Sequence, residues 1–124
     1  MSFITIRGKV KNGKKIGSRI GFPTINISIP RGITKDRWGI YFTLVRIDHH
    51  MYPGVTHLGP VKTFSLRRRT CETFLLTLRR DLYGATVEKK LLFKFRDIEK
   101  FPTTKALKKQ IANDIKAAKK FFGL

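Results

Sequence analysis

Two polar side chains stand close together in the segment Pro23-Thr24-Ile25-Asn26, and each carries a neutral oxygen. If this segment is a strand, Thr24 and Asn26 lie two residues apart and project from the same face. Two such oxygens can bind Mg²⁺, which keeps several waters and usually completes its octahedron with substrate phosphates. The alternative is that both side chains make local turn hydrogen bonds, which is how most such pairs are used.

A glycine-rich, basic segment lies immediately upstream, at residues 8–21. Glycine lets backbone N–H groups come close to an anion, and basic side chains add positive charge, so the composition suits a phosphate-binding loop. It matches neither a P-loop nor a Rossmann fingerprint, and a flexible basic hairpin has the same composition. The residues concerned are Gly8, Gly13, Gly17, Gly21, Lys14, Lys15 and Arg19.

Glu72 is one of only eight acidic residues, and an apolar run, residues 74–76, follows it closely. An unpaired carboxylate is costly to bury, whereas a positioned one can accept the proton of an attacking hydroxyl. Glu72 is therefore a candidate general base. The competing role is a salt bridge to Arg79 or to one of the arginines at 67–69.

The composition limits the classes of protein to which the chain can belong. Its 124 residues, 41% of them hydrophobic, suffice for one core, so we expect a single domain over residues 1–124. No apolar run reaches the roughly 20 residues that span a bilayer, the first residues do not resemble a signal peptide, and Cys71 has no partner for an internal disulfide. We expect a soluble, cytoplasmic monomer.

The charge of the chain is its most prominent compositional feature, because 27 Lys and Arg against eight Asp and Glu give a net charge of +19. Such a field attracts polyanions, which makes nucleic acid, acidic membrane surfaces and phosphorylated small molecules candidate partners. The charge does not select among them, and a solvated basic surface is an equally good explanation.

Alternating or β-rich segments dominate the first three quarters of the chain. With no helix long enough for a parallel crossover between them, they predict a small antiparallel barrel. In the last segment Val87, Leu91, Phe93 and Phe95 are expected on one face, and Glu88, Lys90 and Lys94 on the other. The predicted strands are Phe3 to Val10, Thr24 to Ile29, Trp38 to Ile47, Tyr52 to Leu58, Glu72 to Leu78 and Thr86 to Phe95.

After Pro102 the hydrophobic period changes from two to between three and four. Thr103 or Thr104 can cap a helix, and this helix is expected to end near Gly123 and to close one side of the barrel. Its basic face is either solvated or a binding surface for RNA or a membrane, and solvation is the commoner case. The apolar stripe consists of Leu107, Ile111, Ile115, Ala118 and Phe122.

Taken in order, these segments resemble the riboflavin kinase family, including the kinase half of bacterial bifunctional FAD synthetases. The family pattern runs Gly-x-Val-x-x-Gly-x-x-x-Gly, Gly-Phe-Pro-Thr-Ala-Asn, Gly-x-Tyr, Gly-x-x-x-Thr-Phe, Glu-Thr-His-Leu-Leu and Asp-Leu-Tyr-Gly, followed by an Arg, a Lys-Phe pair and a helix. The matching residues are Gly8-Lys9-Val10, Gly13, Gly17, Gly21 to Asn26, Gly39-Ile40-Tyr41, Gly59, Thr63-Phe64, Glu72 to Leu76, Asp81 to Gly84, Arg96 and Lys100-Phe101.

The resemblance covers essentially the whole chain and implies a mainly β fold: a six-stranded antiparallel Greek-key-type barrel with a C-terminal amphipathic helix. It implies that Thr24 and Asn26 hold Mg²⁺, that Glu72 is the catalytic base and that Arg96 borders the riboflavin site. By the same resemblance, the nucleotide-binding residues are Gly8, Gly13, Gly17, Arg19, Thr24, Asn26 and Tyr83.

The reaction that the resemblance implies is transfer of the ATP γ-phosphoryl group to the 5′-hydroxyl of riboflavin, giving FMN and ADP. No nucleotidyltransferase domain precedes the kinase motifs, so adenylylation of FMN to FAD is not expected. The competing hypothesis is a non-catalytic basic β-barrel that binds nucleic acid or senses a flavin nucleotide.

Several residues depart from the family pattern. Ile25 replaces the usual Ala and should pack in the core, because it points away from Thr24 and Asn26, and Arg19 can supply the basic group missing at Ser18. The other departures bear on flavin recognition and on catalytic rate. They are Val61-Lys62 for Arg-Pro, Thr77 for Asp and Ile98 for Glu.

Overall fold

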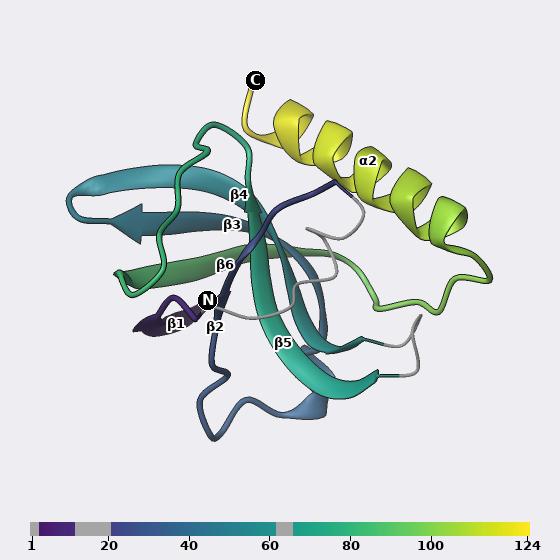
Figure 1. Cartoon of the computed structure of the whole chain (residues 1–124), viewed down its shortest axis with the longest axis horizontal. Coiled ribbons are helices and arrows are strands. Elements are labelled where there is room, and N and C mark those ends of the chain that lie inside the picture. The colour runs from purple at the N-terminus through teal and green to yellow at the C-terminus, as the bar shows by residue number, and fades with distance from the viewer. Residues whose placement is uncertain (1–2, 12–20, 62–65) are drawn as a thin grey trace.

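The computed structural model describes residues 3–11, 21–61 and 66–124. Six strands form one antiparallel sheet in the order β1-β6-β3-β4-β5-β2, and this sheet curls into a half-barrel (Figure 1). A short 3₁₀ helix, η1 (Lys35–Arg37), precedes β3, and the helix α2 (Thr104–Phe121) follows β6. The strands are β1 (Ile4–Lys9), β2 (Ile25–Ile27), β3 (Gly39–Ile47), β4 (His50–Val61), β5 (Leu66–Leu75) and β6 (Thr86–Arg96).

The connectivity is that of a Greek key. The strands β3, β4 and β5 form a meander, and β6 returns to lie beside β3, with β1 outside it. The predicted six-stranded antiparallel fold with a C-terminal helix is confirmed. The main differences are at β2, which is three residues long, and at β5, which begins at Leu66 and places Glu72 in its interior rather than at its start.

The core lies inside the curl of the sheet and follows the period of two expected of strands. Alternate residues of β2, β5 and β6 face it, among them Ile25, Ile27 and Cys71. Ile25 therefore packs in the core, as its position opposite to Thr24 and Asn26 predicts. The same alternation places Lys89 of β6 inside, where it is fully buried.

The face predicted for the end of β6 is wrong beyond Leu91. The β3–β6 register shifts twice: Thr43 pairs with Leu91 but Phe42 pairs with Phe93, and a second shift follows between Ile40 and Tyr41. The first extra residue, Leu92, is a β-bulge that reverses the side on which Phe93 lies, and Phe95, two residues on, is the extra residue of the second shift. Phe93 and Phe95 are consequently 50% and 36% exposed on the outer face.

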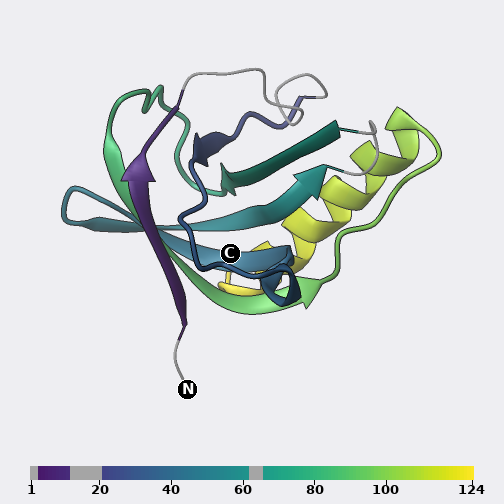
Figure 2. The same cartoon turned by 90° about the horizontal axis from the view of Figure 1, so that it is seen from below.

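The helix α2 lies against the outer face of the curled sheet (Figures 1 and 2). Thr103 caps it by accepting a hydrogen bond from the Ala106 N–H at 3.0 Å, which satisfies one of the orphan N–H groups of the first turn. Ile115 and Ala118 of the predicted stripe are buried. Within the described residues, no helix has the length and apolar character needed to cross a membrane.

Candidate active site

The strand pair β2–β5 brings together three of the predicted site residues. Asn26 stands opposite Glu72 in the register, and the Thr24 hydroxyl donates a hydrogen bond to Oε1 of Glu72 at 2.8 Å. Because Ile25 and Ile27 turn into the core, Thr24 and Asn26 must project to the other side of the chain. These segments are far apart in the sequence, so only the fold could place the three side chains on one face.

The side-chain oxygen of Asn26 has the features of an unused ligand. Asn26 is 5% exposed, and its Oδ1 makes no hydrogen bond within the described part of the chain. A buried acceptor normally has a partner, since leaving it unpaired costs about 1–3 kcal/mol. Asn26 lines neither hollow, but its amide oxygen shares a face of the β2–β5 pair with the Thr24 hydroxyl and the Glu72 carboxylate; a hard divalent cation prefers such oxygens, so the residues present fit Mg²⁺.

Glu72 is 8% exposed, and two of the four arginines that could pair with it, Arg69 and Arg79, lie elsewhere; the side chains of Arg67 and Arg68 lie outside the described residues. Within the described ranges the guanidinium groups of Arg69 and Arg79 lie over the rings of Trp38 and Phe74, each at 5.6 Å, and neither forms an ion pair with Glu72. Its carboxylate is thus held by Thr24 and otherwise faces an open hollow.

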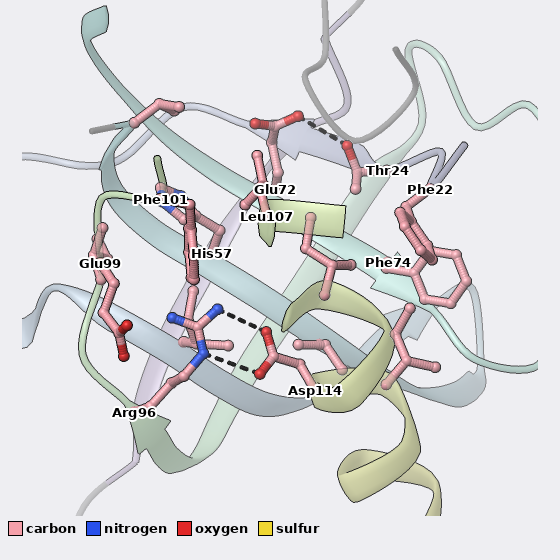
Figure 3. Close-up of a pocket in the computed structure, with 16 residues that line it drawn as sticks. Phe22, Thr24, His57, Glu72, Phe74, Arg96, Glu99, Phe101, Leu107 and Asp114 are labelled. Atoms are coloured by element: carbon pink, nitrogen blue, oxygen red, sulfur yellow. Dashed lines mark hydrogen bonds and ion pairs between the residues drawn. The ribbon is translucent and has the colours of Figure 1, made fainter. Parts of the chain in front are cut away.

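That hollow lies between the sheet and α2, and we call it the helix-side hollow (Figure 3). The Thr24–Glu72 pair stands at one end, and the Arg96–Asp114 pair stands at the other. Most of the wall is apolar and aromatic, which suits a flat ring system. The apolar lining includes Phe22, Ile40, Phe74, Phe101, Leu107 and Ile111.

Arg96 lines the helix-side hollow, but its guanidinium is already engaged. It forms a bidentate pair with Asp114, from Nε to Oδ1 at 2.9 Å and from Nη2 to Oδ2 at 2.7 Å, and Nη1 donates to the Asp97 carbonyl at 3.0 Å. Gln110 also donates to Oδ1 of Asp114 at 2.9 Å. Arg96 therefore fixes α2 to β6 in addition to bordering the hollow.

A second hollow, the arginine-side hollow, shares Thr24 and Phe74 with the first. Arg79, Arg80 and Tyr83 line it, and the Tyr83 side chain is exposed. Two neighbouring hollows with a hydroxyl at their boundary can hold two substrates whose reacting groups meet there.

The predicted glycine loop is only partly described. Gly8 lies in β1 opposite Val87 and lines neither hollow; a Cβ there would be 3.3 Å from that of Ile27, so glycine allows β1 to approach β2 closely. Gly13, Gly17 and Arg19, like Ser18, lie outside the described residues.

The comparison with protein families decides the classification. The family model described as flavokinase, or riboflavin kinase, matches residues 2–122. This chain belongs to the riboflavin kinase family.

Individual riboflavin kinase relatives agree with this classification. An RNA-binding riboflavin kinase of Bacillus subtilis is 38% identical over 96% of this chain and 51% of its own length. A bifunctional riboflavin kinase/FMN adenylyltransferase of Escherichia coli is 35% identical over 96% of this chain and 38% of its own length. The chain thus spans about half or less of these curated relatives.

Among solved structures, the riboflavin kinase from Trypanosoma brucei has a TM-score of 0.65 and 23% identity, and the match covers 99% of this chain and 82% of that one. At 23% identity, this structural similarity establishes the fold alone.

Sequence reasoning missed two polar residues that line the helix-side hollow, Asp114 and His57. Asp114 is 2% exposed, although it sits between lysines in a helix that reads as basic. His57 lines the helix-side hollow, opposite Glu72 in the β4–β5 register, with Nδ1 3.1 Å from the Thr70 hydroxyl. Burial, and then the nearby Arg96 charge, lower the pKa of His57 to about 4, so the ring is neutral at pH 7. Alternation along β4 could have indicated that His57 shares a face with Val55.

Proposed function

We propose that this chain is a riboflavin kinase that transfers the γ-phosphoryl group of ATP to the 5′-hydroxyl of riboflavin, giving FMN and ADP. The observation that carries the proposal is the position of Glu72. Its carboxylate opens onto the apolar helix-side hollow, and its hydrogen-bond partner Thr24 stands at the boundary with the arginine-side hollow. A base so placed meets a hydroxyl from one side and a phosphate from the other.

In this proposal Glu72 accepts the proton of the riboflavin 5′-hydroxyl as the oxygen of that hydroxyl bonds to the γ-phosphorus. The bond from the γ-phosphorus to the β,γ-bridging oxygen breaks, and ADP leaves with the electron pair. The hydrogen bond from Thr24 at 2.8 Å holds the carboxylate in one orientation. Positioning and electrostatics supply most of the acceleration in reactions of this type.

The helix-side hollow would hold the isoalloxazine ring of riboflavin. Phe22 and Phe74 pack edge to face, with ring centroids 6.0 Å apart, on one side of the hollow, and Phe101 and His57 lie on the other (Figure 3). Neutral His57 can exchange hydrogen bonds with a polar edge of the ring without placing a charge against it. Arg96 would border the ring while keeping its pair with Asp114.

The arginine-side hollow would hold ATP, with Arg79, Arg80 and Tyr83 at its wall. Thr24 and the Oδ1 of Asn26, which has no hydrogen-bond partner among the described residues, would be ligands for Mg²⁺, which when bound offsets negative charge on the phosphates. The predicted roles of Gly8, Gly13, Gly17 and Arg19 in nucleotide binding remain proposals. So do the single domain over residues 1–124, the monomeric state and the cytoplasmic location.

The competing hypothesis of a non-catalytic barrel that binds nucleic acid gains no support from the helix-side hollow, because its mostly apolar lining offers a polyanion backbone little to bind. A barrel that only senses a flavin nucleotide would bind flavin in the same hollow but form no FMN.

The test is FMN formation by the purified 124-residue chain with ATP, MgCl₂ and riboflavin, followed by chromatography. Glu72→Gln should lower kcat by roughly 10²–10⁴-fold, the usual contribution of a positioned base, and leave the circular dichroism spectrum unchanged. Glu99→Gln is the matched control, because Glu99 is a second carboxylate on the helix-side hollow, and its kcat should stay within about threefold. No FMN from the unmodified chain, or equal rates for the two variants, would refute the proposal.

A further inference from the structure

Lys89 is the largest fully buried side chain among the described residues, and it occupies the interior of the curled sheet. It lies on β6 between Val87 and Leu91, both of which belong to the hydrophobic core. An ammonium group in such surroundings is very costly unless it is well hydrogen-bonded. Its Nζ donates to the carbonyl oxygen of Cys71 at 2.8 Å and to that of Ile25 at 3.0 Å.

These two carbonyl groups belong to the peptide bonds that directly precede Asn26 and Glu72. The Cys71 carbonyl is in the same rigid peptide plane as the N–H of Glu72, and the Ile25 carbonyl is in the same plane as the N–H of Asn26. Asn26 and Glu72 stand opposite each other across β2 and β5. One ammonium group therefore restrains the backbones of β2 and β5 directly before Asn26 and Glu72.

Among the described residues, few contacts hold the strand β2, so such a restraint matters there. It is three residues long and lies at the end of the strand order, where β5 is its one neighbour among the described strands. On its other side, a single bridge is described, from the Lys11 N–H to the Asn26 carbonyl at 2.8 Å. Core packing of Ile25 and Ile27 and the Thr24–Glu72 hydrogen bond also constrain β2.

We propose that Lys89 is a positioning residue that keeps Asn26, and with it Thr24, aligned with Glu72. The inference rests on the kinase activity proposed above. Lys89 lines neither hollow, so it acts through the backbones of β2 and β5 rather than on a substrate. Its loss should impair phosphoryl transfer and MgATP binding, while riboflavin binding against α2 should persist.

The variant that tests this is Lys89→Met, which keeps an unbranched apolar side chain and removes all three N–H donors. Val87→Ala is the matched control, because Val87 is on the same strand, faces the same core and donates no hydrogen bond to β2. Both are compared with the unmodified chain at a temperature where circular dichroism shows all three fully folded. Should Lys89→Met not fold, Lys89→Gln, which keeps two donors without the charge, replaces it.

We expect Lys89→Met to lower kcat at least tenfold and raise KM for MgATP severalfold, with the Kd for riboflavin, measured by flavin fluorescence quenching, within twofold. Val87→Ala should change each quantity by less than threefold. Amide hydrogen exchange at residues 25–27 should be at least tenfold faster in Lys89→Met than in Val87→Ala.

Equal effects of the two variants, or a riboflavin Kd that rises as much as the KM for MgATP, would show that Lys89 serves only as part of the core. Either result would overturn the inference. The exchange measurement separates this failure from failure of the proposed function. If the unmodified chain makes no FMN, the kinase proposal fails, yet faster exchange at residues 25–27 still supports the restraint, and unchanged exchange refutes it.

Discussion

The ion pair between Arg96 and Asp114 should be a main determinant of how α2 stays on the sheet, and Asp114→Asn tests this. The side chains are 15% and 4% exposed, and the pair is bidentate, with N–O distances of 2.9 and 2.7 Å. Replacing one oxygen by an NH₂ group breaks one of the two bonds and leaves the guanidinium without a counter-charge. Removing one partner of a buried pair costs about 3–5 kcal/mol.

The lower end of that range applies here, because Arg96 keeps some solvent contact and its bond to the Asp97 carbonyl at 3.0 Å. With an unfolding entropy of about 2.1 cal/mol/K per residue, a loss of about 3 kcal/mol in a chain of this length lowers Tm by roughly 11 °C. Because α2 forms one wall of the helix-side hollow, riboflavin should also bind more weakly.

Thermal unfolding followed by circular dichroism measures the first effect, and flavin fluorescence quenching the second. The matched control is Glu88→Gln, which removes the partner of Arg46 in a pair that is 3.5 Å long with side chains 50% and 30% exposed. Exposed pairs contribute about 0–1 kcal/mol, so Tm should fall by no more than about 4 °C. Equal Tm shifts for Asp114→Asn and Glu88→Gln would show that the buried pair does not anchor the helix.

Three further predictions concern single residues. Because the pKa of His57 is about 4 in the folded chain and about 6.5 unfolded, the unfolded state binds more protons between these values. The free energy of unfolding should therefore fall as pH drops from 6.5 to 4, by about 2 kcal/mol for this partly buried ring; His57→Gln should remove that dependence in urea titrations. In the same titrations, Gly59→Ala should lower the free energy of unfolding by at least 2 kcal/mol, because φ of Gly59 is +130° and the new Cβ would lie 2.8 Å from Ile98 Cδ1. The control Gly84→Ala should cost about 1 kcal/mol, because Gly84 has a φ of +83° but no atom within 4 Å of the new Cβ. Asn26→Ala should leave stability unchanged or slightly higher, since it removes a buried oxygen that has no partner in the described part of the chain. It should nevertheless raise the Mg²⁺ concentration needed for half-maximal FMN formation at least tenfold.

The elements of the fold were predictable because each has a clear period. Alternation located six strands, and a spacing of three and four with a threonine cap located α2. The prediction that Thr24, Asn26 and Glu72 belong to one site came from the resemblance to a family. The local sequence pattern could not supply it, because it gives no register between distant strands.

What could not be predicted depends on tertiary geometry. The bulges in β6 depend on the pairing with β3, and without them the alternation puts Phe93 and Phe95 on the wrong face. The buried position of Asp114 depends on Arg96, which lies on another element, so a charge pattern along the helix does not reveal it. Lys89 did follow the alternation, but a lysine is an improbable core residue until two carbonyl acceptors are seen around it.

The Greek-key order also has a consequence for folding. The β3–β4–β5 meander joins neighbouring segments, whereas the β1–β6 ladder pairs Ile4 with Leu91, and the Thr24–Glu72 hydrogen bond spans 48 residues. Long loops close late because their entropy must be lost before any contact offsets it. Newly made chains should therefore acquire their meander and helix before the Thr24–Glu72 hydrogen bond, and regain of FMN formation after dilution from urea should lag behind regain of secondary structure.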